Sequence, residues 1–143
     1  MTTEGIAAAL LRHARTVLAE AERMAAAGDH ALAVRRSQEA VELTAKALLR
    51  SAGVEVPHVH DVGPALRRNR ARFGPAVKPE IDRLARISRR LARERTTAFY
   101  GEEESGASPE ELYDVEDAHQ AAADARWAVE LCARSIESTP SGS

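Results

Sequence analysis

An arginine stands among apolar residues in the most regular helical pattern of this chain. Small and apolar side chains recur there at steps of three and four residues, which puts them on one helix face. That face comprises Ile81, Leu84, Ser88, Leu91, Arg95 and Ala98. Because a guanidinium is costly to bury, Arg95 needs a carboxylate partner or an anionic ligand. Spacing leaves both open: a structural ion pair with Glu42 or Asp61, or an anion-binding arginine in a cleft.

A second charged set shares one face of an earlier helical pattern. Its members, at steps of four, three and four residues, are Arg35, Glu39, Glu42 and Lys46. Glu42 and Lys46 have the favourable i, i+4 orientation, which contributes only about 0.2–0.5 kcal/mol. Taken alone, the set predicts a solvated helix face. Ser88 and Lys46 can nevertheless line the same opening as Arg95, so we favour a cleft in which Arg95 awaits an anion.

The histidines and the cysteine give weaker evidence of a functional site than Arg95 does. His58 and His60 have the side chains of metal ligands, but no third or fourth ligand follows at a recognisable spacing. His60-Asp61 is better interpreted as the polar start of a short helix, with Asp61 as its N-cap. Cys132 lies in an apolar helical stripe and is interpreted as packing rather than as a nucleophile. No glycine-rich phosphate loop is present. We expect neither a metal nor a cofactor.

The elements that position these residues are helices. Apolar periodicity and capping residues predict helices over about 3–27, 30–52, 62–72, 79–100 and from a capping box at 108–111 to about 136. Gly28 is expected to end the first helix and Asp29 to cap the second. Residues 54–60 alternate like a strand, but Pro57 and the lack of a partner strand favour a loop. The prediction is all-α: an up-and-down antiparallel bundle of four long helices plus one short helix.

Length and composition are consistent with that fold. A chain of 143 residues allows one domain, expected over 1–138 with a disordered tail at 139–143. The single cysteine excludes an intrachain disulfide and indicates a reducing compartment. No apolar run approaches the roughly 20 residues of a membrane span, and the N-terminus lacks the pattern of a signal peptide. We therefore expect a soluble, cytoplasmic protein.

The net charge of −2 conceals a segregation. Residues 67–95 carry ten Arg and one Lys against three acids, whereas residues 101–130 carry ten acids against Arg126 alone. One interpretation is a basic helix and an acidic helix that compensate each other; the other is a basic surface for an anionic ligand. The overall acidity argues against bulk nucleic-acid binding. The outer arginines of the fourth helix, at 83, 86, 90 and 93, need acids or solvent. Acids from a second protomer would give a homodimer whose association is sensitive to salt.

Two segments together resemble the HEPN family, the helical domain named for higher eukaryotes and prokaryotes nucleotide-binding. The first is the run from Ala33 to Leu49, which contains Glu42, Lys46 and Ala47 and is followed by Gly53, Pro57 and His60-Asp61. The second runs from Arg93 to Gly101, with Tyr113 and an alanine-rich helix behind it. Gly28-Asp29-His30 matches the usual break between the first two helices. The resemblance covers about residues 6–136.

The resemblance implies a fold, a site and partners. HEPN domains are up-and-down helical bundles that commonly form homodimers through the helices bearing an arginine motif. Many are metal-independent ribonucleases in which a histidine follows the arginine after four to six residues, and the motifs of two protomers meet in a cleft. Small stand-alone members are often encoded beside a minimal nucleotidyltransferase as toxin and antitoxin. The motif position in this chain is Arg95, with Arg93 as a second candidate.

The chain departs from the nuclease motif at the histidine. Four residues lie between Arg95 and Tyr100, which stands where the histidine is expected. An imidazole with a pKa of about 6.5 exchanges protons at neutral pH, whereas a phenol near 10 is about one part in a thousand ionised. Phe99 and Tyr100 can stack on a base or fill the bundle core.

We therefore expect a HEPN-like module that binds a nucleotide or RNA phosphate, or a nucleotidyltransferase partner, with weak or no catalysis. Its expected site residues are Arg95, Arg93, Tyr100, Lys46, Glu42 and Asp61. The alternative is a metal-independent ribonuclease that uses Arg95 with Tyr100 in place of histidine. A third interpretation is a structural bundle in which Arg95 only closes an ion pair.

Overall fold

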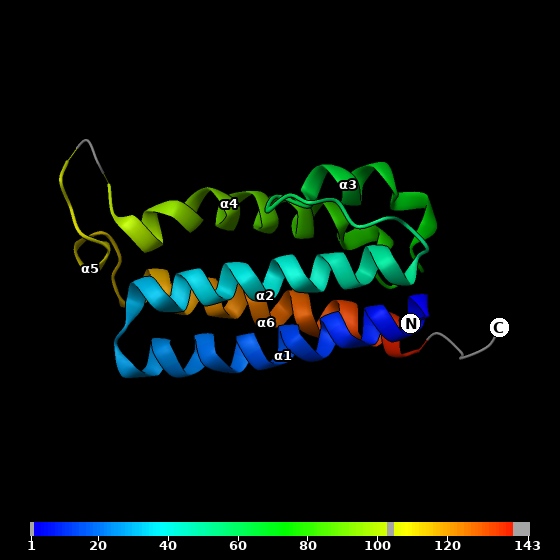
Figure 1. The fold of residues 1–143 in the computed structure, drawn as a ribbon, viewed down its shortest axis with the longest axis horizontal. Helices are drawn as coiled ribbons and strands as arrows, with labels where there is room; N and C mark the ends of the chain where they lie inside the picture. The colour runs from blue at the N-terminus through cyan, green and yellow to red at the C-terminus, as the bar shows by residue number, and fades with distance from the viewer. Residues whose placement is uncertain (1, 103–104, 139–143) are drawn as a thin grey trace.

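Four long helices lie side by side in the computed structural model, which describes residues 2–102 and 105–138 (Figure 1). They are α1 (Thr3–Ala27), α2 (His30–Ser51), α4 (Ile81–Tyr100) and α6 (Val115–Glu137). The short elements are α3 (Gly63–Arg68), α5 (Pro109–Leu112) and the 3-10 helices η1 (Arg70–Arg72) and η2 (Lys78–Glu80). Extended pairing in the described residues is one isolated bridge between Glu102 and Ala107. The all-α bundle is confirmed, with one short α-helix more than expected.

Alanine sets how closely the helices approach. Alanine is the commonest buried residue of α1, α2 and α6, so their backbones pack closely, whereas leucine and isoleucine dominate the buried face of α4. Helix α2 lies at the centre and packs against α1, α4 and α6 (Figure 1). Helix α4 packs mainly on α2, less extensively on α3 and only lightly on α6. One side of α4 is therefore left towards solvent.

Helix ends follow the expected chemistry at one junction and differ at another. Gly28 has φ +84°, and the Asp29 side chain accepts a hydrogen bond from the Leu32 N–H at 3.2 Å, as predicted. The capping box expected at Ser108 is wrong. Helix α5 ends after one turn because Tyr113 takes an extended backbone, and α6 starts afresh with a capping box between Asp114 and Asp117.

The expected short helix is shorter and begins later than predicted. It is divided into α3 and η1, and Val62 rather than Asp61 is at the N-cap. The Asp61 Oδ1 instead accepts hydrogen bonds from the Gly63 N–H at 2.9 Å and the Ser88 hydroxyl at 3.3 Å. The Ser88 Oγ also accepts from the Val62 N–H at 3.0 Å. Ser88 is 3% exposed and fastens α3 to α4, so the expectation that it lines a cleft with Lys46 is wrong.

Three further points concern Cys132, membrane spans and the end of the chain. Cys132 is fully buried, as expected for packing, and this burial raises the pKa of its thiol to about 12. Across the described ranges, none of the helices combines the length and apolar character of a membrane span. The tail at 139–143, expected to be disordered, lies outside the described residues.

Candidate functional site

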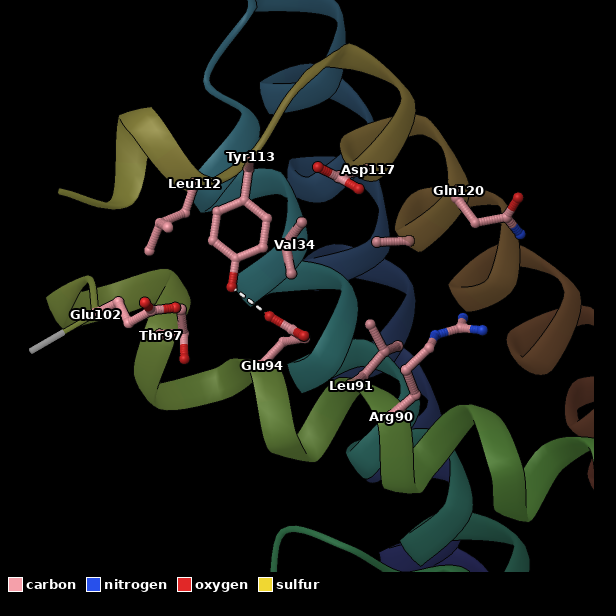
Figure 2. A pocket seen from close by; sticks show the side chains of 11 residues that line it. Val34, Arg90, Leu91, Glu94, Thr97, Glu102, Leu112, Tyr113, Asp117 and Gln120 are labelled. Atoms are coloured by element: carbon pink, nitrogen blue, oxygen red, sulfur yellow. Dashed lines mark hydrogen bonds between the residues drawn. The ribbon is translucent and has the colours of Figure 1, made fainter. Parts of the chain in front are cut away.

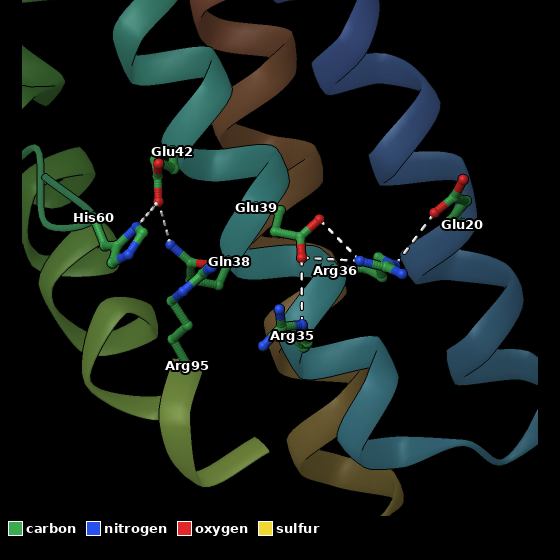
Figure 3. Close-up of polar contacts among 8 residues, drawn as sticks. All are labelled: Glu20, Arg35, Arg36, Gln38, Glu39, Glu42, His60 and Arg95. Carbon is green, nitrogen blue, oxygen red and sulfur yellow. Dashed lines mark hydrogen bonds and ion pairs between the residues drawn. The ribbon is translucent and has the colours of Figure 1, made fainter. Parts of the chain in front are cut away.

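Arg95 lies on the inner face of α4, where it is half-buried between the buried residues Leu91 and Ala98 of the same stripe. Its Nη1 donates a hydrogen bond to the Gln38 Oε1 of α2 at 3.0 Å (Figure 3). No carboxylate in the described residues lies within ion-pair distance of the guanidinium. The alternative of a structural ion pair with Glu42 or Asp61 is therefore wrong, and a neutral amide holds the arginine.

Glu42 is engaged by three other side chains. Its Oε2 accepts from the Lys46 Nζ at 2.9 Å, and its Oε1 accepts from the Gln38 Nε2 at 2.8 Å and from the His60 Nδ1 at 2.9 Å. Burial alone would raise the pKa of Glu42, but hydrogen bonds from these three partners outweigh burial and hold the pKa below its ordinary value. The carboxylate is thus ionised at neutral pH.

The solvated face expected from the polar spacing on α2 is wrong. The side chains of Glu42 and Lys46 are 14% and 15% exposed. The loop that carries His60 reaches this part of α2, and α4 packs along the same helix (Figure 3). A helical pattern of polar residues cannot distinguish solvent from a covering loop, because both satisfy polar groups.

Gln38 links the two charged groups, and its orientation is determined by Glu42. An ionised carboxylate only accepts hydrogen bonds, so the amide nitrogen of Gln38 must face Glu42. The amide oxygen consequently faces Arg95. Gln38 is 2% exposed, so its packing fixes this arrangement. Sequence reasoning missed Gln38, which lies 57 residues from Arg95 in the chain.

His60 joins the same network with one ring nitrogen still available. Because Glu42 is ionised, the Nδ1 of His60 carries the proton and donates it to the carboxylate. In the neutral form of the ring the Nε2 holds a lone pair, and it has no hydrogen-bond partner among the described residues. The side chain is 57% exposed. An imidazole oriented by a carboxylate is the arrangement of a general base. The sequence interpretation treated His60 only as a helix start.

The end of α4 presents two exposed aromatic rings. Phe99 is 52% exposed and Tyr100 is 75% exposed, so these residues do not fill the core. The rings meet edge to face with centroids 4.5 Å apart, and the guanidinium of Arg35 lies 4.3 Å from the centroid of Phe99. Arg35 also pairs with Glu39 (Figure 3). The exposed rings can stack on a planar ligand.

The expected site residues fall into three groups. Arg95, Glu42 and Lys46 belong to one hydrogen-bonded network through Gln38. Arg93 and Tyr100 are exposed on α4. Asp61 is not brought to Arg95, because it supports the start of α3 next to His60. Nowhere in residues 2–102 and 105–138 do three His, Cys, Asp or Glu side chains gather as metal ligands would.

A separate cavity of about 390 Å³ opens between α2, α4, α5 and α6 (Figure 2). Its lining includes Glu94, Glu102 and Asp117, whereas the basic Arg90 is paired with Asp124. The Tyr113 hydroxyl donates to the Glu94 Oε2 at 2.5 Å, and burial followed by this contact raises the pKa of Tyr113 far above its ordinary value. The cavity contains none of the expected site residues and its charge disfavours phosphate.

Comparison with protein-family models matches residues 7–136 to the HEPN domain. Comparisons with curated proteins and with solved structures give no significant match. The matched range contains all four long helices almost completely, together with the Arg95 network and the aromatic end of α4.

Proposed function

The chain belongs to the HEPN domain family, and on that basis we propose that it binds a nucleotide or an RNA phosphate with little or no catalysis. The observation that carries this proposal is the half-buried Arg95, whose contact in the described structure is to the neutral amide of Gln38. Its positive charge is therefore not neutralised by any residue of 2–102 and 105–138. A phosphate supplies the missing negative charge.

The geometry around Arg95 supports an anion rather than a structural role. A guanidinium carries five N–H donors, and Gln38 uses one of them. Because Glu42 fixes the orientation of Gln38, the arginine is held in one position before any ligand arrives. Preorganisation of this kind lowers the entropy lost on binding.

Two neighbours on α4 support a nucleotide in particular. Arg93 offers a second, exposed cation two residues before Arg95, on another side of the same helix. The exposed ring of Tyr100 offers a face on which a base can stack, which is worth about 1–3 kcal/mol per base. Arg93 can thereby bind a phosphate, and Tyr100 can stack on a base.

Weak catalysis follows from the same residues. The motif histidine is replaced by Tyr100, whose ring is 75% exposed and whose hydroxyl contacts no basic group in the described structure. A phenol in such surroundings removes a proton from a ribose 2′-hydroxyl inefficiently at neutral pH.

The test is binding of fluorescein-labelled single-stranded RNA, measured by anisotropy in EDTA. We expect the natural protein to bind and Arg95→Gln to lose most of the affinity. Arg12→Gln is the matched control, because Arg12 is exposed on α1 and its side chain has no partner among the described residues. Equal affinities for all three proteins would contradict the proposal.

The alternative function, a metal-independent ribonuclease, is favoured by one observation. His60 is exposed, its Nδ1 is held by Glu42, and its Nε2 lone pair is available near the Arg95 network. In this alternative His60 takes the place of the motif histidine, with Arg95 stabilising the phosphate charge. RNA cleavage in EDTA that is lost in His60→Ala and Arg95→Ala but kept in Tyr100→Phe would establish it. Cleavage lost in Tyr100→Phe would assign the base to Tyr100 instead.

Partners form a further part of the proposal. We propose a homodimer in the cytoplasm and a minimal nucleotidyltransferase as companion, in the manner of toxin and antitoxin. Support comes from the family and from the segregated charges, since the acids of 101–130 can meet the arginines of another copy. Sedimentation at low and high salt tests the dimer, and a monomer under both conditions would contradict it. A neighbouring reading frame and co-purification test the companion.

A further inference from the structure

Helix α4 has three distinct sides. The inner side, which includes Arg95, packs on α2. A second side faces α6, where the guanidinium of Arg83 lies 3.9 Å from the centroid of Trp127 and Arg90 pairs with Asp124. The third side follows steps of three and four residues and comprises Arg86, Arg89, Arg93, Thr96 and Tyr100. The sequence places the outer arginines 83, 86, 90 and 93 in one group. In the structure Arg83 and Arg90 face α6, whereas Arg86 and Arg93 lie on the third side.

No residue that the structure describes neutralises the arginines of the third side. Arg86, Arg89 and Arg93 are exposed and make no hydrogen bond or ion pair with any described residue. Asp82 begins the same side, but Arg67 and Arg70 already bind its carboxylate. We call Arg86, Arg89 and Arg93 the arginine stripe.

Like charges at this spacing repel each other. Side chains three and four residues apart on a helix have Cβ atoms about 5–6 Å apart, and like-charged pairs at this distance destabilise the helix. A polyanion lying along the stripe removes that repulsion and releases its own counterions at the same time.

We propose that the arginine stripe is a track for single-stranded RNA that leads to Tyr100. The inference rests on the proposed function and deepens it: the ligand is an oligonucleotide rather than a single nucleotide. At a rise of about 1.5 Å per residue, the side from Arg86 to Tyr100 extends for roughly 21 Å. One nucleotide does not span this distance, so a lone nucleotide at the Arg95 site cannot contact the whole stripe.

Two features favour a single strand over the other polyanions. The track ends at the exposed rings of Phe99 and Tyr100, and only an unpaired base offers a free face for stacking. The positive strip is also narrow, because the protein as a whole carries a net charge of −2 and the neighbouring residues 101–130 are acidic. A wide duplex would meet those acids, whereas a strand on α4 avoids them.

The experiment compares decauridylate with uridine monophosphate over a series of KCl concentrations. The stripe variant, Arg86→Gln/Arg89→Gln, removes two arginines of the stripe and leaves Arg93, which belongs to the proposed nucleotide site. The variant Arg12→Gln/Arg134→Gln is the matched control: its two arginines are exposed on α1 and α6, their side chains have no partner in the described parts of the chain, and the variant carries the same total charge. Circular dichroism verifies that both variants remain helical.

We expect the stripe variant to lose affinity for decauridylate and to keep its affinity for uridine monophosphate. Single strands contribute about −0.7 per contacted phosphate to the slope of log K against log salt, so removal of two contacts should reduce the magnitude of the slope by about 1.4. The affinity for decauridylate should fall at least about tenfold at low salt. Uridine monophosphate should bind the stripe variant as it binds the natural protein, and the control variant should retain both affinities.

Several results would overturn the inference and leave the Arg95 site standing. These are an unchanged slope in the stripe variant, an equal loss in the control variant, or natural protein that binds decauridylate no more tightly than uridine monophosphate. Conversion of a dimer to a monomer in the stripe variant, with RNA binding intact, would assign the stripe to a second copy of the chain. If natural protein binds neither probe, the proposed function and the track both fall.

Discussion

The substitution Arg95→Ala separates a binding arginine from a structural one. It removes one hydrogen bond, 3.0 Å long, to a neutral amide, and no ion pair of the described structure. The space vacated by the half-exposed guanidinium admits water to the Gln38 oxygen. The expected loss in unfolding free energy is therefore about 1–2 kcal/mol. An arginine that closed a buried ion pair would cost about 3–5 kcal/mol.

Glu42→Ala supplies an internal standard in the same network. It deletes three hydrogen bonds and takes away the counter-ion of Lys46, whose side chain is 15% exposed. We expect a loss of about 3 kcal/mol or more, because a poorly solvated ammonium loses its partner. The Arg95 substitution should thus be clearly the milder of the two.

Thermal melting with and without a nucleotide completes the assay. At a ligand concentration of about 100 times Kd, binding adds about 2.7 kcal/mol to the stability of the natural protein. For a domain of this size, each kcal/mol shifts Tm by a few degrees. Arg95→Ala should lower Tm slightly and abolish the ligand-induced shift. The reasoning is refuted if Arg95→Ala costs as much as Glu42→Ala while the natural protein shows no shift with uridine monophosphate.

Three further predictions concern single groups. The lowered pKa of Glu42 means that its ionised form stabilises the fold fully above about pH 4.5 and progressively less as pH falls through the folded-state pKa, so urea midpoints of Glu42→Gln should depend less on acid. Cys132, buried and with its pKa raised to about 12, should react with dithionitrobenzoate only as fast as the protein unfolds; rapid reaction of native protein would contradict this. Gly101→Ala should lower the urea midpoint strongly, because Gly101 has φ +84° and a Cβ there would lie 2.3 Å from the Ala107 carbonyl oxygen; Gly74→Ala, with open space around it, should not.

The sequence predicted the fold because its signals are local. Steps of three and four residues determine which side of a helix is buried, and the inner face of α4 from Ile81 to Ala98 matched the structure. The helix end at Gly28 and the helix cap at Asp29 could also be predicted, because each depends only on residues close to it in the chain. The half-buried location of Arg95 followed from the same periodicity, without knowledge of the opposite helix.

Partner choice across helices could not be predicted in this way. Glu42 and Gln38 lie one turn apart on α2, and spacing alone cannot tell which of them meets Arg95. The answer depends on the loop that brings His60 to Glu42 from 18 residues away. A loop of this kind has no periodic pattern of residues, so its path cannot be predicted from the sequence.

The misplaced capping box has a similar origin. Both Ser108 and Asp114 precede an acidic residue three positions later, and each sequence can start a helix. What decides between them is tertiary: the Tyr113 ring is buried at 9% exposure and hydrogen-bonds Glu94 of α4. The chain must extend at Tyr113 to reach this position, so the first start yields only the single turn of α5.

Glu42 has a wider role than its place on a polar helix face indicates. Its carboxylate determines which nitrogen of His60 carries the proton, and it also determines which end of the Gln38 amide faces Arg95. Both effects arise because an ionised carboxylate can only accept hydrogen bonds. An amide at this position could donate to either neighbour, and both orientations would then be lost together. His60 and Arg95 are thus connected through one acidic residue of α2, far from the arginine motif in the sequence.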